Sequence, residues 1–90
     1  MKLTKNQCEL LRNANDKLRG TNDYNRYHME CTVRSESGKW LFCSWSAPRS
    51  NHLTVKTVRG VTYLYENDEF FPDCVYRYAV NDAVKKLLNL

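Results

Sequence analysis

The stretch CTVRSESGKWLFCSW, residues 31 to 45, limits the folds open to this chain more than any other feature of its sequence. Apolar and polar residues alternate from Tyr27 to Arg34, which is the period of a strand with one buried face. The turn Glu36-Ser37-Gly38 follows, and glycine readily adopts the left-handed conformation that closes a three-residue hairpin loop. The sequence therefore predicts an antiparallel hairpin.

The register of this hairpin follows from pairing Ser35 with Lys39, which makes every opposed pair on the inner face apolar. These pairs are Val33 with Leu41, Cys31 with Cys43, and Met29 with Trp45. A slip of one residue would place Arg34 opposite Lys39, so we prefer the first register. The outer face then holds Trp40 opposite Arg34, Phe42 opposite Thr32, Glu30 opposite Ser44, and His28 opposite Ser46.

A helix is predicted to begin after Thr4, because Thr4-Lys5-Asn6-Gln7 fits the capping box. Its apolar stripe contains Cys8, Leu11, Ala14 and Leu18, and Gly20 provides the stop. On the opposite face of this helix, positively and negatively charged side chains alternate, which is typical of a solvated face with weak ion pairs. This face consists of Lys5, Glu9, Arg12, Asp16 and Arg19.

A second hairpin is predicted from the β-branched and aromatic runs 53–58 and 61–66, which flank Arg59-Gly60. Its expected register places Val58 opposite Val61, Val55 opposite Leu64, Lys56 opposite Tyr63, and Thr54 opposite Tyr65.

The C-terminal region allows two interpretations. We favour one helix from about Asp73 to Leu88, with a stripe of Tyr76, Val80, Ala83, Val84 and Leu87. The alternative is a fifth strand over residues 74–80, rich in strand formers, followed by a shorter helix capped by Asn81.

The expected fold is a single α+β domain over residues 1–90. It consists of a helix, a four-stranded antiparallel sheet made of two hairpins, and a C-terminal helix, with both helices on one face of the sheet. The other face is then open to solvent or to a partner.

The candidate binding site lies on this open face, where flat rings and cations suit unpaired bases and phosphates. The residues expected to form it are Trp40, Phe42, Arg34, His28, Lys39, Lys56, Arg59, Tyr63 and Tyr65. The competing interpretation is that Phe70-Phe71 or a helix covers Trp40 and Phe42 and makes a two-sided core.

The charge distribution fits nucleic acid without requiring it. Residues 1–60 contain eleven Lys or Arg and five acids, whereas residues 61–90 contain three Lys or Arg and five acids. Our first functional hypothesis is a nucleic-acid-binding module. The alternative is a protein-interaction module, a small inhibitor or adaptor such as viruses and mobile elements encode, which uses the aromatic patch or the acidic loop 66–69.

Enzymatic and metal chemistry are not expected. The four cysteines, Cys8, Cys31, Cys43 and Cys74, have no C-x-x-C spacing, so we interpret them as reduced core thiols. A zinc site built from Cys31 and Cys43 with His28, His52 or Cys8 matches no known finger spacing. No cofactor is expected, and because the sequence lacks a membrane span or a signal peptide, we expect a cytoplasmic protein.

Overall fold

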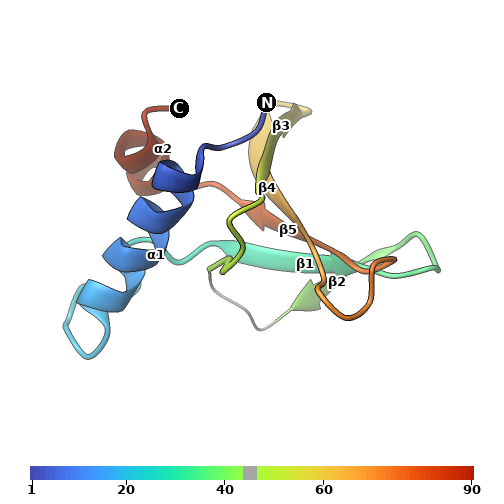
Figure 1. Ribbon diagram of the computed structural model, residues 1–90, viewed down its shortest axis with the longest axis horizontal. Coiled ribbons are helices and arrows are strands. Elements are labelled where there is room, and N and C mark those ends of the chain that lie inside the picture. The colour runs from blue at the N-terminus through green and yellow to red at the C-terminus, as the bar shows by residue number, and fades with distance from the viewer. Residues whose placement is uncertain (44–46) are drawn as a thin grey trace.

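The computed structural model describes residues 1–43 and 47–90 and shows two helices and an antiparallel sheet (Figure 1). The elements in chain order are α1 (Lys5–Leu18), β1 (Glu30–Arg34), β2 (Trp40–Cys43), β3 (Thr54–Val58), β4 (Val61–Asn67), β5 (Val75–Ala79) and α2 (Asp82–Leu88). The predicted α+β class is confirmed, but the sheet has five strands instead of four.

The sheet order is β2-β1-β5-β4-β3, so β5 lies at the centre between the two hairpins. It pairs with β1, where Cys31 is opposite Tyr78, and with β4, where Leu64 is opposite Tyr78. Without β5 the two hairpins would have no common strand. The last strand in the sequence therefore unites the sheet.

The favoured helix from Asp73 to Leu88 is wrong, and the alternative of a strand followed by a shorter helix is confirmed. Asn81 caps α2, because its side chain accepts a hydrogen bond of 2.8 Å from the amide of Val84. The residues before it can complete two ladders of backbone hydrogen bonds as a central strand, which outweighs the helical spacing of their apolar side chains.

Both predicted hairpin registers are confirmed over the described residues. In the first, Arg34 is opposite Trp40 and Cys31 opposite Cys43, and in the second, Val58 is opposite Val61. The predicted pairs of Met29, Glu30 and His28 with residues 44–46 lie outside the described residues.

The N-terminal helix begins as predicted. Thr4 and Gln7 form a reciprocal capping box, and the Gln7 side chain also donates a 3.0 Å hydrogen bond to the carbonyl of Leu88 at the end of α2. Gly20, with φ of 80°, lies just beyond the end of α1 and adopts the left-handed conformation expected of it.

The core lies between the helices and one face of the sheet, which we call the inner face. Helix side chains such as Leu11 and Val84 are buried together with Cys31, Leu64 and Tyr78 from the strands. Figure 1 shows α1 and α2 side by side at one end of the sheet. The strand residues that alternate with the inner ones form the outer face, and none of them belongs to the buried core.

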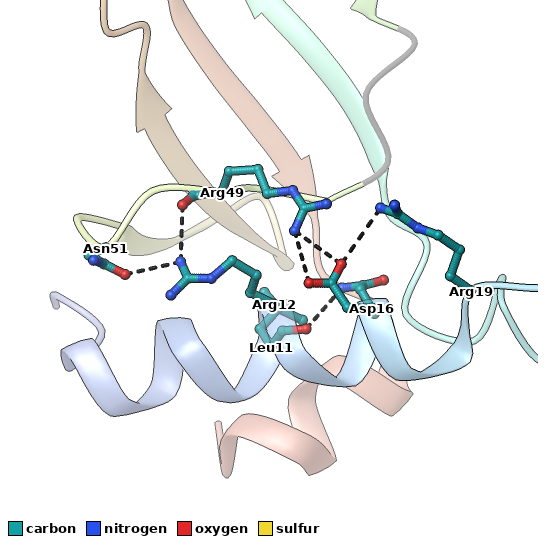
Figure 2. A network of polar contacts seen from close by, with 7 residues as sticks. Leu11, Arg12, Asp16, Arg19, Arg49 and Asn51 are labelled. Atoms are coloured by element: carbon teal, nitrogen blue, oxygen red, sulfur yellow. Dashed lines mark hydrogen bonds and ion pairs between the residues drawn. The ribbon is translucent and has the colours of Figure 1, made fainter.

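Polar contacts join α1 to the segment before β3 (Figure 2). Arg12 donates hydrogen bonds to the carbonyl of Arg49 and to the side chain of Asn51, and Asp16 forms an ion pair of 3.1 Å with Arg49. Asp16 also accepts a longer contact from Arg19. The charged face of α1 is therefore partly docked on this segment, whereas the sequence predicted a solvated face.

Within residues 1–43 and 47–90, neither helix has the length and apolar content needed to cross a bilayer.

Candidate nucleic-acid interface

Strand alternation brings three cations and three aromatic rings together on the outer face. β1 and β2 contribute the opposed pair Arg34 and Trp40, and β5 contributes Arg77 beside them. The neighbouring strands β4 and β3 supply two tyrosines and a lysine. We call this set the cation–aromatic array; its members are Arg34, Trp40, Lys56, Tyr63, Tyr65 and Arg77.

Arg77 lies at the centre of the array. Its guanidinium carbon is 4.0 Å from the centroid of the Trp40 ring and 4.4 Å from the centroid of the Tyr63 ring. Cations at such distances are attracted to the negative faces of aromatic rings. One arginine therefore links the first hairpin to the second across the central strand.

The remaining contacts extend the array on both sides. The guanidinium carbon of Arg34 is 5.2 Å from the Trp40 centroid, and Lys56 Nζ is 5.4 Å from the Tyr65 centroid. Tyr65 is in edge-to-face contact with Trp40 and with Tyr63, with centroids 6.1 Å apart in both pairs. These contacts restrict the rings and hold the cations above them.

The array keeps its positive charge, because neutral rings attract cations without neutralising them. Among the described residues, no carboxylate forms an ion pair with Arg34, Lys56 or Arg77. Glu30 is the acidic strand residue on the same face, and it lies opposite Ala79. The electrostatic surface of the array is therefore suited to an anionic partner.

Two buried polar atoms at the array lack a hydrogen-bond partner among the described residues. Arg77 Nε and Thr32 Oγ1 are buried without a partner among the described residues, and the two residues are opposed across β1 and β5. An unsatisfied buried polar group costs about 1–3 kcal/mol. The packing of Arg77 against Trp40 and Tyr63 is therefore maintained at some cost to stability.

Five of the nine residues predicted from the sequence belong to the array: Arg34, Trp40, Lys56, Tyr63 and Tyr65. Phe42 lies on the same face, with 80 % of its surface exposed.

The other three predicted residues lie apart from the array. His28 precedes β1, and its carbonyl accepts a 2.9 Å hydrogen bond from the Asn81 side chain. Lys39 lies in the turn before β2, and Arg59 lies in the turn between β3 and β4. All three are exposed, and none of them belongs to the cation–π pairs of the array.

Arg77 is the array residue that the sequence analysis missed. The error follows from the favoured helix over residues 73–88, which places Arg77 on a helix instead of on the outer face. The alternative strand over residues 74–80 contained the signal, because the alternation of Tyr76, Arg77 and Tyr78 puts the arginine opposite the core side.

The two-sided core is not found in the described part of the chain. Phe70 and Phe71, which were its proposed cover, are 80 % and 65 % exposed. Trp40 is half-buried, and Tyr65, Arg34 and Arg77 of the array lie against its ring. The indole is therefore enclosed from the sides by the array and not by a second layer.

The acidic loop is largely occupied by internal hydrogen bonds. Glu66 accepts from the Tyr78 hydroxyl and from the amides of Arg49 and Ser50. Asp68 accepts from the Tyr76 hydroxyl and from two backbone amides, and these hydrogen bonds, led by that of Tyr76, lower the pKa of the carboxyl below 3.8. These carboxylates hold loops in place, which leaves Glu69 as the freely exposed acid of the loop.

The cysteines divide into two environments. Cys8 and Cys31 are buried in the core, and burial raises the pKa of both thiols. Cys43, opposite Cys31 across the hairpin, and Cys74, before β5, are half-buried. Across residues 1–43 and 47–90, no three side chains of His, Cys, Asp or Glu are grouped as a metal would require.

Comparison with known proteins gives no further guide: no protein-family model, curated protein or solved structure matches this chain.

Proposed function

We propose that this protein is a non-enzymatic module that binds nucleic acid through its outer sheet face. The observation that carries the proposal is the array itself, in which three cations, without carboxylate partners among the described residues, are held over aromatic rings. Phosphate contacts supply most of the affinity of sequence-independent nucleic-acid binding.

The geometry supports different roles for the rings and the cations from those that their residue types suggest. Arg34 and Arg77 lie over Trp40, and Arg77 also lies over Tyr63, so these ring faces are shared with cations. We infer that the rings orient the cations toward phosphates. A guanidinium held in advance loses less side-chain freedom when it binds an anion.

Phe42 is the ring best placed to meet a base. It is on the same face as Trp40, and it is 80 % exposed. Stacking of a base on an aromatic ring contributes about 1–3 kcal/mol and requires an unpaired base. We therefore propose single-stranded or locally unpaired nucleic acid as the ligand.

Fluorescence anisotropy with labelled DNA and RNA strands tests the proposal. The test variant is Arg34→Gln with Lys56→Gln, and the matched control is Lys17→Gln with Lys86→Gln, which removes the same charge from exposed helix positions. We expect the test variant to lose most of the affinity and to reduce the salt slope by about 1.4, or 0.7 for each lost contact to a single strand. Equal losses in both variants would show that only net charge matters.

A protein partner is the second candidate, favoured by the exposure of Phe42 together with the neighbouring array. Aromatic and arginine side chains are common anchors of protein interfaces. The discriminating observation is the salt dependence. An aromatic protein interface is expected to respond weakly to salt, whereas nucleic-acid affinity falls log-linearly with salt concentration.

A further inference from the structure

The two edges of the sheet differ in how they are protected. At the β3 edge, the N-terminal segment forms a bridge between Lys2 and Thr54, and its backbone bonds to Leu53 and Val55. β3 also carries Lys56 near its middle. A covering segment and a lysine are two common means by which proteins prevent an edge strand from pairing with another chain.

Among the described residues, the β2 edge has neither protection. Its sequence is Trp40-Leu41-Phe42-Cys43, which contains no charge, and among the described residues the strand pairs only with β1. Leu41 on the inner face and Phe42 on the outer face are 57 % and 80 % exposed. An apolar edge that is exposed on both of its faces is a typical site of strand addition.

We propose that β2 pairs antiparallel with β2 of a second copy of this chain, which gives one continuous sheet through both copies. This interface shares Trp40 and Phe42 with the outer face, but the strand pairing does not depend on the nucleic-acid proposal. The second copy is favoured as the occupant because the strand is complementary to itself.

Self-complementarity follows from the register in which Leu41 lies opposite Leu41 of the second copy. Trp40 then lies opposite Phe42 of the second copy, and Phe42 opposite its Trp40. Because Trp40 and Phe42 share a face, aromatic residues meet on the outer side and leucines meet on the inner side. No two like charges are opposed along the four residues of β2.

This register also keeps the two sheets in phase. Registers that oppose Leu41 and Phe42 would join the outer face of one copy to the inner face of the other. With Leu41 at the twofold axis, both outer faces lie on the same side, so the arrays of the two copies form one longer surface. Because a twofold interface of this kind is closed, both β2 edges are paired and no edge is left there for a further copy.

Sedimentation equilibrium without nucleic acid, at two salt concentrations, tests the pairing apart from the proposed function. The wild-type protein is expected to sediment as a dimer whose stability changes little with salt, since the strand is uncharged. Leu41→Lys should shift it to monomer, whereas Val58→Lys, a matched change at the far hairpin, should leave it dimeric. Leu41 lies on the inner face, so Leu41→Lys should retain nucleic-acid binding by a monomer.

A cross-linking variant keeps the test decisive if Leu41→Lys does not fold. Leu41→Cys should form an intermolecular disulfide between the two copies of position 41 under mild oxidation, identified by peptide mass mapping. A wild-type protein that remains monomeric up to several hundred micromolar would overturn the proposal. So would a dimer that persists in folded Leu41→Lys.

Discussion

The guanidinium carbon of Arg77 lies 4.0 Å from the centre of the Trp40 ring, which joins the central strand β5 to the edge strand β2 across β1. This contact gives the outer face its defined form. Arg77 is held by Trp40 on one side and Tyr63 on the other, so its charge is fixed in the middle of the sheet. The proposed binding of nucleic acid depends on that placement.

Replacing Arg77 by methionine separates the charge from the packing. Methionine retains a long flexible side chain and removes both the cation and the buried Nε, which has no partner among the described residues. The lost cation–π contacts and the relieved unsatisfied donor are of similar size, so we expect unfolding free energy to change by less than about 1 kcal/mol. Affinity for single-stranded DNA should fall about tenfold, measured by anisotropy beside thermal denaturation. Unchanged affinity would remove Arg77 from the binding surface.

Trp40→Ala is expected to weaken binding because Arg34 and Arg77 lose the ring that holds them. The same change removes a half-buried side chain, so unfolding free energy should also fall, by about 1–3 kcal/mol. Trp40→Phe is the matched variant, since it keeps an aromatic face at this position, and it should retain most of the affinity. If Trp40→Ala lowers the melting temperature but binds like the wild type, the indole has only a structural role.

The hairpins could be predicted from the sequence because each has one buried face, and the alternation of Cys31, Thr32 and Val33 fixes which side chains point inward. The start of α1 was equally clear, since the capping box of Thr4 and Gln7 is a local sequence signal. β5 was harder. As the central strand it is paired on both sides, and Tyr76 and Val80 fit a helical spacing as well as a strand spacing. Only the long-range pairing with β1 and β4 decides between them.

The candidate site could likewise be predicted where its contacts lie within one hairpin. Arg34 opposite Trp40 and Lys56 opposite Tyr63 follow from hairpin registers, which are local. The contact of Arg77 with both hairpins depends on sheet order, and no local pattern encodes that order. His28 was expected on the outer face because the predicted strand began at Tyr27, but β1 begins only at Glu30. Lys39 and Arg59 lie in the turns that precede β2 and follow β3.

Ionisation of Tyr78 is expected to make the free energy of unfolding depend on pH in the alkaline range. Burial, followed by the charge of Glu66, raises the pKa of the Tyr78 hydroxyl in the folded protein above its ordinary value of 10.0. The protonated form is favoured by folding, so this stabilisation is complete below pH 10 and is lost as pH rises further. Urea unfolding between pH 9 and 11.5 should show a decline that is shallower in Tyr78→Phe. Parallel declines in both proteins would contradict this assignment.

Thiol labelling should divide the four cysteines. Cys8 and Cys31 are buried and have raised pKa values, so they are expected to react slowly with a maleimide at pH 7.5. Cys43 and Cys74 are half-buried and should react at least tenfold faster. Peptide mass mapping over time identifies the modified positions, and labelling under urea supplies the unprotected rates. Rapid native labelling of Cys31 would contradict its position in the core.

Chemical-shift mapping by NMR, during titration with a short single-stranded oligonucleotide, identifies the face of the protein that contacts the ligand. Binding through the outer face should give the largest shifts at the Trp40 indole Nε1–H, the Arg77 Nε–H and the backbone amides of β1, β2, β4 and β5. The amides of α1 and α2, on the far side of the core, should shift little. Shifts confined to the helices, or none at saturating oligonucleotide, would contradict binding through the outer face.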